Sequence, residues 1–180
     1  MQIDFVIMCG GYGARLKPFT YLIPKPFLTA NNISPFEFTL KNILRNTNAR
    51  RIFVTVFYKK DYIQKALRKQ NKKIKLINEN EPMGTAGSLR SIIKKNCSKN
   101  LIITNGDIYS KINYEKLIKN HIKSNSDITM CIKSHKISIP YAVMSKKKNN
   151  QIFFKEKPII VKKINAGIYV IKKTYLVKFF

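Results

Sequence analysis

A loop able to hold phosphate groups follows the first apolar segment of the chain. Gly10, Gly11 and Gly13 are followed by Arg15 and then by Lys25, which stands between two prolines. Glycine accepts positive φ angles and lets backbone N–H groups approach an anion, while arginine and lysine supply positive charge. These residue types in this order indicate a site for a polyphosphate.

The spacing excludes two other nucleotide-binding loops. No Lys-Ser or Lys-Thr pair follows the last glycine, as a Walker A loop requires, and Leu16 stands where a dinucleotide-binding loop has its third glycine. Glycine-rich turns also follow the first strand of many α/β proteins without any such role, so the glycines alone leave both interpretations open. Arg15, Thr20 and Lys25 favour phosphate binding.

Residues 10–26 resemble the signature of the sugar-phosphate nucleotidylyltransferases, G-G-x-G-x-R-L-x-P-x-T-x-x-x-P-K-P, and match it at every specified position. Later segments resemble the same family in the same order, at 81–89, 105–107, 156–158 and 165–170. Segments 127–132 and 139–143 are most similar to the mannose-1-phosphate guanylyltransferase-like branch, whose members are often linked to CBS repeats.

The resemblance implies a defined reaction. In this family a sugar 1-phosphate oxygen attacks the α-phosphate of a nucleoside triphosphate, and pyrophosphate leaves. By resemblance the three glycines cradle the triphosphate, Arg15 neutralises the departing pyrophosphate and Lys25 bridges the reacting phosphates. Asp107 would hold Mg²⁺, which favours one or two carboxylates together with phosphate oxygens. Asn-Gly-Asp is also a good turn sequence in its own right.

Further site residues follow from the resemblance. Segment 79–87 corresponds to the part that contacts the base in relatives, with Gly84 and Thr85 as the expected contacts. The expected sugar-phosphate contacts are Glu156, Lys157, Asn165 and Gly167. Structural alternatives stay open, since Thr85 could cap a helix near Ala86, the Glu-Lys-Pro tripeptide could be an exposed loop, and Gly167 could mark a bulge.

Strand-like and helix-like segments alternate along the chain, which indicates an α/β protein with a mostly parallel central sheet and helices on both faces. Apolar periodicity predicts strands at 3–8, 52–57, 74–77, 101–104, 128–132, 142–144, 152–154 and 168–171, and helices at 35–46, 61–69, 86–94 and 113–122. Ligands of open α/β sheets bind beyond the carboxyl ends of the strands. The loop after Met8 that carries Gly10, Gly11 and Gly13, here called the glycine loop, and Asp107 can therefore face one site. The resemblance implies a Rossmann-like (GT-A-like) nucleotidyltransferase fold.

The chain is strongly basic, with 35 lysine and arginine residues, 9 aspartate and glutamate residues and a formal net charge of +26. The lysines are dispersed and form no stripe at helical spacing, so we expect attraction of nucleotides and sugar phosphates but no specific nucleic acid partner. Cys9, Cys97 and Cys131 lack metal-binding spacing and indicate buried thiols. His121 and His135 are expected to be structural.

No basic segment precedes the short first apolar run, and no apolar run reaches the length of a membrane span. We therefore expect a cytoplasmic protein without a membrane span. Apolar side chains near the C-terminus could promote association into a homo-oligomer; they are Tyr175, Leu176, Phe179 and Phe180.

Three features depart from the family pattern. Ala14 replaces the usual Thr or Ser after the third glycine, and Ala142 replaces a usual Gly. No second metal-binding aspartate in an Asp-Ile-Gly context follows the Asn-Ala-Gly segment. We expect one nucleotidyltransferase domain over residues 1–180 that lacks the family's C-terminal part.

The leading hypothesis is an enzyme that joins a nucleoside triphosphate, with GTP favoured, to a sugar 1-phosphate for surface glycan biosynthesis. A catalytically impaired module that binds nucleotide or sugar nucleotide and regulates a partner is the alternative, supported by the missing second aspartate. A nucleic-acid-binding protein is a third possibility, but the chain lacks an aromatic RNP-like motif and a basic helix.

Overall fold

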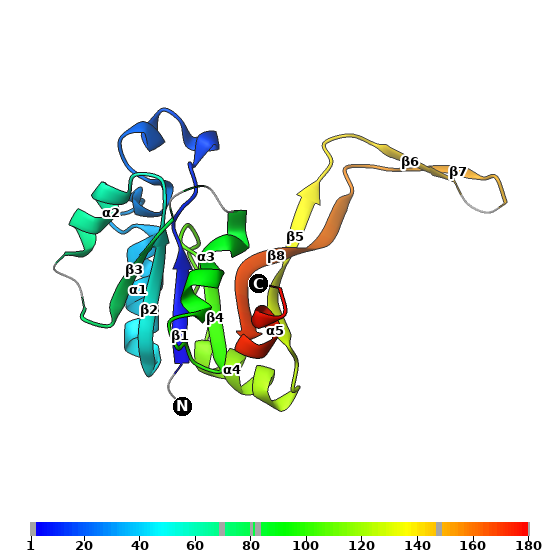
Figure 1. Ribbon diagram of the computed structural model, residues 1–180. Coiled ribbons are helices and arrows are strands. Elements are labelled where there is room, and N and C mark those ends of the chain that lie inside the picture. The colour runs from blue at the N-terminus through cyan, green and yellow to red at the C-terminus, as the bar shows by residue number, and fades with distance from the viewer. Residues whose placement is uncertain (1–2, 69–70, 80, 82–83, 147–148, 180) are drawn as a thin grey trace. The chain divides into compact units, whose positions relative to one another are not determined.

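Strands and helices alternate along the chain in a computed structural model that describes residues 3–68, 71–79, 81, 84–146 and 149–179 (Figure 1). The main-sheet strands are β1 (Ile3–Met8), β2 (Ala49–Val56), β3 (Ile74–Asn78), β4 (Asn100–Asn105), β5 (Ile128–Ser138) and β8 (Ile159–Lys172). The helices are α1 (Pro35–Asn46), α2 (Lys60–Leu67), α3 (Gly84–Ile93), α4 (Tyr114–Lys123) and α5 (Lys173–Val177). Short 3₁₀ helices, η1 (Ala14–Leu16), η2 (Phe19–Tyr21) and η3 (Lys25–Phe27), lie between β1 and α1.

The main sheet has six strands in the order β3-β2-β1-β4-β8-β5. β1 pairs in parallel with β2 and β4, and β2 pairs in parallel with β3, whereas β8 runs antiparallel to β4. The prediction of a mostly parallel sheet is confirmed. The order places β1 between β2 and β4, so the segments that follow these three strands share the carboxyl edge of the sheet.

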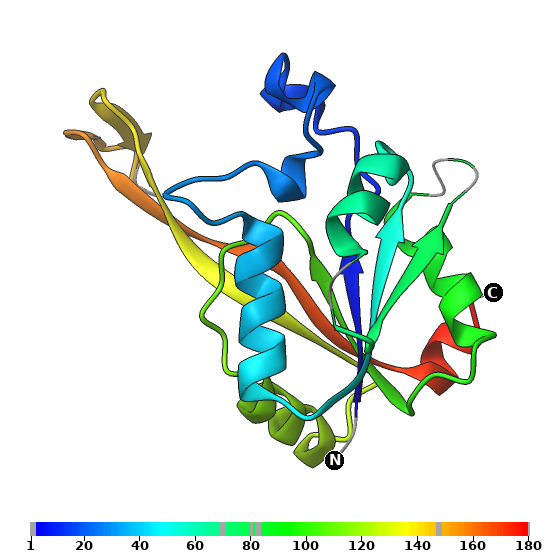
Figure 2. The same cartoon turned by 90° about the vertical axis from the view of Figure 1, so that its left-hand side faces the viewer.

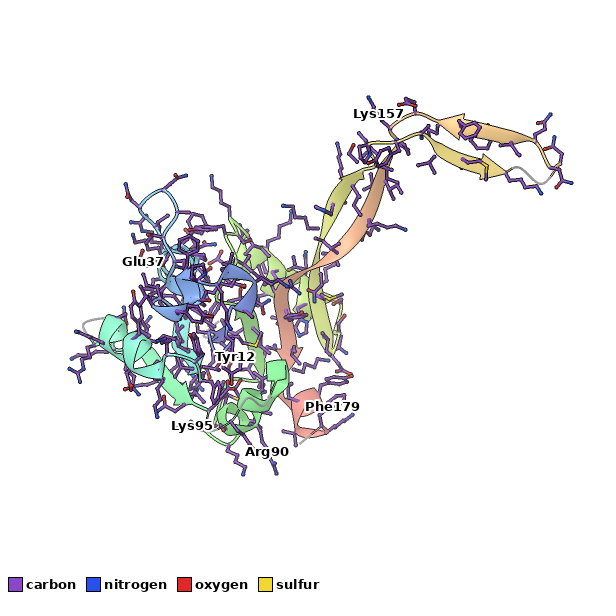
Figure 3. All side chains as sticks on the ribbon, turned by 90° about the horizontal axis from the view of Figure 1, so that it is seen from above. Tyr12, Glu37, Arg90, Lys95, Lys157 and Phe179 are labelled. Carbon is purple, nitrogen blue, oxygen red and sulfur yellow. The ribbon has the colours of Figure 1, made fainter. Side chains whose placement is uncertain are left out.

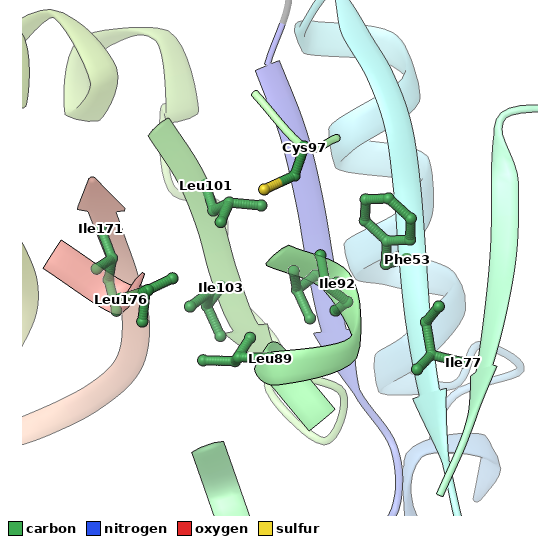
Figure 4. Close-up of a cluster of buried hydrophobic side chains, with 10 residues drawn as sticks. Phe53, Ile77, Leu89, Ile92, Cys97, Leu101, Ile103, Ile171 and Leu176 are labelled. Carbon is green, nitrogen blue, oxygen red and sulfur yellow. The ribbon is translucent and has the colours of Figure 1, made fainter. Parts of the chain in front are cut away.

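Helices cover both faces of this sheet, as predicted. Phe5 of β1 packs edge-on against Tyr114 of α4, with ring centroids 5.3 Å apart. The next residue, Val6, points to the other face, where it joins a buried cluster with Leu89 of α3 and Leu176 of α5 (Figure 4). Figure 2 shows α1 and α4 together on one side of the strands.

Helix α1 begins where the sequence provides a cap and is tied to the loop after β4. The Ser34 side chain accepts a hydrogen bond from the Glu37 backbone N–H, and the Glu37 carboxylate accepts one from the Ser34 N–H, each at 3.2 Å. Further along the helix, Thr39 Oγ1 donates to the Ile108 carbonyl at 3.1 Å. The helix therefore braces the backbone beside Asp107.

The amino ends of the strands carry a buried charge cluster. Asp4 is fully buried and accepts hydrogen bonds from Arg50 Nη2 at 2.8 Å, Arg51 Nη2 at 2.9 Å and the Ser98 N–H at 2.8 Å. Burial by itself would raise the pKa of Asp4, but hydrogen bonds from Arg50, Arg51 and Ser98 outweigh burial and lower it. This cluster ties β1 to β2 and to the segment before β4, at the edge opposite the glycine loop.

His121 has the structural role that the sequence predicts. The ring is buried on α4, and Nδ1 lies 2.7 Å from Thr129 Oγ1 in a hydrogen bond. Burial lowers the pKa of His121, and the nearby positive charge of Lys172 lowers it further. The neutral ring therefore links α4 to the start of β5.

The chain divides into two compact units, Met1–Thr129 with Gly167–Phe180, and Met130–Ala166. The second unit contains the antiparallel strands β6 (Val143–Lys146) and β7 (Ile152–Lys155). Many of its large apolar side chains are exposed, among them Ile132, Tyr141, Met144, Ile152, Phe154 and Val161. The expectation of one domain over residues 1–180 stays a prediction.

Several element bounds differ from the sequence-based ones. β5 and β8 extend well beyond the predicted 128–132 and 168–171. The sequence does not predict these extensions because most of the added residues are exposed and lack the alternation that marks a half-buried strand. α3 begins at Gly84 and not at Ala86, and α2 ends at Leu67, while position 69 lies outside the described residues. Within the described part of the chain, no helix is both long and apolar enough to cross a membrane.

Candidate functional site

A cavity of about 500 Å³ lies at the carboxyl edge of β1, β2 and β4. Its lining includes the glycine loop, Arg15, Lys25 and Asp107, together with Thr55 at the end of β2. The glycine loop and Asp107 thus share one cavity, as the strand order predicts. In Figure 3 Tyr12 is labelled on this loop.

The cavity contains an ion pair between residues far apart in the sequence. Lys25 Nζ lies 2.5 Å from Asp107 Oδ2, and the two side chains are 41% and 28% exposed. Lys25 comes from η3, and Asp107 from the turn that follows β4. A mobile cation and a carboxylate, both open to the cavity, can contact a phosphate group and a divalent metal ion respectively.

The backbone of the glycine loop bends at Gly13. This residue has a φ of 64°, in the left-handed region that favours glycine. A Cβ there would stand 2.8 Å from Thr20 Cγ2 and 3.0 Å from Lys25 Cβ, so the bend also needs the missing side chain. Thr20 is buried and donates from Oγ1 to the Gly13 carbonyl at 3.2 Å. The signature residues Gly13, Thr20 and Lys25 therefore pack on one another.

Gly11 differs from Gly13 because the protein itself leaves room for a side chain. A Cβ at Gly11 would meet no atom of the described residues within 4 Å. Gly11 also lines the cavity. The glycine at this position therefore fits a requirement of a bound phosphate better than a requirement of folding.

Alanine at Gly13 is expected to weaken folding, and alanine at Gly11 is expected to weaken nucleotide binding. We expect Gly13→Ala to lose about 1–3 kcal/mol of folding free energy because of its positive φ. We expect Gly11→Ala to fold normally and to lose about 1–3 kcal/mol of nucleotide binding, since a methyl group would crowd the phosphate. Urea unfolding and calorimetric titration with GTP measure the two quantities. Unchanged GTP affinity in Gly11→Ala would contradict the role assigned to Gly11.

The turn that carries Asp107 fits closely against the end of β1. The Gly106 N–H donates to the Met8 carbonyl at 2.9 Å, and a Cβ at Gly106 would stand 2.6 Å from Cys9 Sγ. Cys9 is buried, and burial followed by the negative charge of Asp107 raises the pKa of its thiol. Cys9 therefore serves as a packing residue beneath the site, as the sequence predicts.

The remaining predicted site residues fall into two groups. Gly84 and Thr85 lie in the first turn of α3, so the interpretation of Thr85 as an N-cap is wrong, and the structure does not describe their side chains. Glu156, Lys157 and Asn165 belong to the second unit, on which Lys157 is labelled in Figure 3.

Gly167 has a packing requirement of its own. It adopts a φ of 69° in β8, and a Cβ there would stand 2.7 Å from Asn105 Nδ2 and 2.6 Å from Ile108 Cδ1. Glycine thus lets β8 approach the Asn-Gly-Asp turn closely. The predicted sugar contact of Gly167 stays a prediction.

Three further side chains at the site are not among the predicted site residues. Glu79 follows β3 and lines the cavity, with Oε1 placed 3.5 Å from where a Cβ of Gly10 would stand. Ser88 of α3 is buried and also lines the cavity. Tyr58 follows β2 and donates from Oη to the Thr20 carbonyl at 2.8 Å. The family resemblance marks the segments that contain Glu79 and Ser88, whereas the only signal for Tyr58 is its position just beyond a strand.

The residues present suit a metal ion that is held partly by its substrate. Within the described ranges, no three His, Cys, Asp or Glu side chains are grouped as metal ligands. Asp107 offers one partly exposed carboxylate beside the glycine loop. Mg²⁺ is commonly bound by one or two carboxylates together with phosphate oxygens and water, so this donor set fits it.

Sequence comparison gives relatives with related names. The chain is 28% identical over 174 residues to D-glycero-alpha-D-manno-heptose 1-phosphate guanylyltransferase of Aneurinibacillus thermoaerophilus, covering 95% of this chain and 75% of that protein. It is 31% identical over 180 residues to mannose-1-phosphate guanylyltransferase catalytic subunit beta of Drosophila melanogaster, covering 95% and 48%. The chain thus spans about half the length of the second relative.

Solved structures resemble the fold over nearly the whole chain. HddC from Yersinia pseudotuberculosis matches with a TM-score of 0.73 and 30% identity, covering 98% of this chain and 79% of that chain. HddC complexed with GMP-PN matches with a TM-score of 0.71 and 27% identity, covering 97% and 78%. The predicted α/β nucleotidyltransferase fold is confirmed.

The family model described as Nucleotidyl transferase matches residues 5–179. That range contains the glycine loop, the Lys25–Asp107 ion pair and every other residue that we assign to the cavity. The signature loop, the fold and the family model agree. The chain belongs to the nucleotidyl transferase family.

Proposed function

We propose that the chain is a sugar-1-phosphate nucleotidylyltransferase that takes GTP in preference to other nucleotides. The observation that carries this proposal is the Lys25–Asp107 ion pair beside the glycine loop in a single cavity. The pair brings together the two kinds of group, a cation and a metal-binding carboxylate, that transfer between two polyanions requires. The names of the relatives support the sugar phosphate and the guanylyl group.

The cavity residues would act mainly by placing and neutralising phosphates. Backbone N–H groups of the loop around Gly11 would hold the triphosphate, with Arg15 beside the departing pyrophosphate. Lys25 would contact both the α-phosphate and the attacking sugar phosphate. Asp107 would hold Mg²⁺, which when bound offsets the negative charge of the phosphate oxygens.

The attacking group needs no general base at neutral pH. The second ionisation of a phosphate monoester has a pKa of roughly 6, so most of the sugar 1-phosphate already carries a free anionic oxygen. The described lining of the cavity contains no histidine, and its cysteine, Cys9, is buried with a raised pKa. The charged oxygen therefore attacks directly once Lys25 and the loop have brought the two phosphates together.

Glu79 is the cavity residue whose chemistry favours guanine. A carboxylate only accepts hydrogen bonds, and guanine offers two adjacent donors, the ring N1–H and the 2-amino group. Adenine lacks that pair. Glu79 lies close to Gly10, and its backbone N–H is held by the Val56 carbonyl at 2.8 Å. The resemblance also assigns base contacts to the segment that begins at Glu79.

We expect Glu79→Gln to reduce the preference for GTP over ATP by about 1–3 kcal/mol, because the amide replaces one acceptor by a donor. Competition binding with GTP, ITP and ATP measures this preference, since inosine lacks the 2-amino group. Glu115→Gln, which changes an exposed carboxylate of α4 outside the cavity lining, is the control. An unchanged preference in Glu79→Gln would assign base selection to other residues.

The sugar side of the proposal rests on the family resemblance. Glu156 would order sugar hydroxyls and Lys157 would contact the sugar phosphate, with Asn165 and Gly167 as further sugar contacts. The role in glycan biosynthesis, the cytoplasmic location and a homo-oligomer stay predictions.

The test is pyrophosphate release by the purified chain with Mg²⁺, individual nucleoside triphosphates and a panel of sugar 1-phosphates. We expect release only when both substrates are present, with GTP giving the highest rate. Removal of the metal by EDTA should stop release, and added Mg²⁺ should restore it. Saturable GTP binding without release would instead support the impaired binding module.

A further inference from the structure

The end of β2 and the turn between β2 and α2 contact the glycine loop at successive points. The Cys9 N–H donates to the Thr55 carbonyl at 3.0 Å, which continues the pairing of β1 with β2 beyond the last residue of β1. The Cβ of Phe57 lies 3.5 Å from where a Cβ of Gly10 would stand. The first part of the loop therefore rests on the end of β2.

Two aromatic residues of this turn pack against the ring of Tyr12. The Tyr12 ring packs edge-on against Phe57, with centroids 5.6 Å apart, and lies 5.4 Å from the ring of Tyr58. Phe57 and Tyr58 are half-buried, whereas Tyr12 is half-exposed at the loop. These contacts hold Tyr12 in place. Tyr12 stands between Gly11 and Gly13, and all three residues line the cavity.

Tyr58 also reaches the far end of the same loop. Its hydroxyl donates to the Thr20 carbonyl at 2.8 Å, and the Thr20 hydroxyl in turn donates to the Gly13 carbonyl at 3.2 Å. Thr20 is fully buried, and the two hydrogen bonds are partly buried. One side chain thus contacts the loop before Arg15, through Tyr12, and after it, through Thr20.

We propose that Tyr58 is a positioning residue for nucleotide binding, which holds both ends of the segment that carries Gly13 and Arg15. The inference rests on the proposed function for its ligand, a nucleoside triphosphate. A preformed loop offers its N–H groups to the phosphates without paying ordering entropy at the moment of binding. Loss of the Tyr58 hydroxyl leaves the ring contacts with Tyr12 in place and removes only the link to Thr20.

The first experiment compares wild type with Tyr58→Phe by amide hydrogen exchange and by GTP binding. We expect faster exchange at positions 11–20 in the free variant, with the exchange of β1 and β4 unchanged. We expect the Kd for GTP with Mg²⁺ to rise by about twofold to twelvefold, the effect of one hydrogen bond between neutral groups. The KM for the sugar 1-phosphate should not move, and the Tm should fall by no more than about 6 °C, the effect of losing one hydrogen bond in a chain of this size.

The control is Tyr109→Phe, which removes a hydrogen bond of the same kind elsewhere. Tyr109 Oη donates to the Ile33 carbonyl at 2.6 Å, outside the glycine loop. We expect this variant to leave exchange at positions 11–20 and GTP affinity unchanged. Tyr58→Leu, which also removes the ring, should weaken GTP binding more than Tyr58→Phe does.

Three outcomes would overturn the inference. Wild-type exchange at positions 11–20 in Tyr58→Phe would show that the hydroxyl does not hold the loop. Faster exchange with unchanged GTP affinity would show that Tyr58 contributes only to folding. An equal rise in KM for both substrates together with a larger fall in Tm would show the same. A wild-type protein that binds no nucleotide would refute the proposed function, and exchange alone would then decide whether Tyr58 holds the loop.

Discussion

Lys25→Ala is expected to lower kcat for pyrophosphate release by about a hundredfold to a thousandfold, the usual effect of removing one charge-stabilising group from an active site. Asp107→Asn should have a loss at least as large and should raise the Mg²⁺ concentration needed for half-maximal rate, because the amide is a weaker ligand for a hard cation. Both residues are partly exposed, so loss of their ion pair should cost less than about 1 kcal/mol of folding free energy. Steady-state kinetics and thermal unfolding measure the two effects.

Lys41→Ala is the matched control, since Lys41 is an exposed lysine of α1 outside the cavity lining. In so basic a protein, any lysine contributes to general attraction of anions, and the control separates that contribution from contact with the reacting phosphates. Full activity in Lys25→Ala or in Asp107→Asn would remove the proposed site.

Asp4→Ala is expected to cost about 3 kcal/mol of folding free energy, near the lower end for breaking a buried ion pair. The lower end applies because Arg50 and Arg51 are 35% and 27% exposed and can turn toward water once Asp4 is gone. The Ser98 N–H also loses its acceptor. Urea unfolding measures the loss, which should appear without any change in the GTP affinity of the folded protein.

The lowered pKa of Asp4 also predicts an acid response. Its stabilising contribution is complete above the ordinary carboxyl value of 3.8 and is lost as the pH falls through the lower value of the folded state. Asp4→Ala should therefore show a weaker dependence of stability on pH below about 4 than wild type does. Asp61→Ala, which removes an exposed carboxylate in the first turn of α2, should leave the folding free energy and its pH dependence nearly unchanged. Equal stability of Asp4→Ala and wild type would show that the arginines tolerate the loss.

The sequence predicts β1 and α1 with the bounds that the structure has, for physical reasons that lie within each segment. β1 is a short apolar run closed by the glycine loop, and α1 carries its own capping residues, Ser34 and Glu37. The outer parts of β5 and β8 have no such local signal. Exposed residues such as Lys133, Lys136 and Lys162 occupy them, so strand formation there depends on pairing with another strand and not on burial.

For the site, the sequence predicts the groups that carry charge but not the groups that hold them. The glycines, Lys25 and Asp107 are recognisable because their types and order match a family signature, and the strand order explains why they share a cavity. Tyr58 stands alone after β2, without periodicity or motif, and Glu79 is marked only as the first residue of the segment that resembles the base-contacting part of relatives. Their contacts with the loop depend on the parallel pairing of these strands with β1, which a single segment does not encode.

The pairing of β1 with β4 sets how refolding can be followed. Met8 pairs with Asn105 and Ile7 with Thr104, so the glycine loop and Asp107 leave the sheet side by side. A slip of one residue between these strands would displace Asp107 by about 3.3 Å along the strand and reverse the faces of its neighbours. Circular dichroism would hardly distinguish such a sheet from the native one, because both have the same strand content. Recovery of nucleotide turnover would respond to the native register alone, which makes activity a measure of strand alignment.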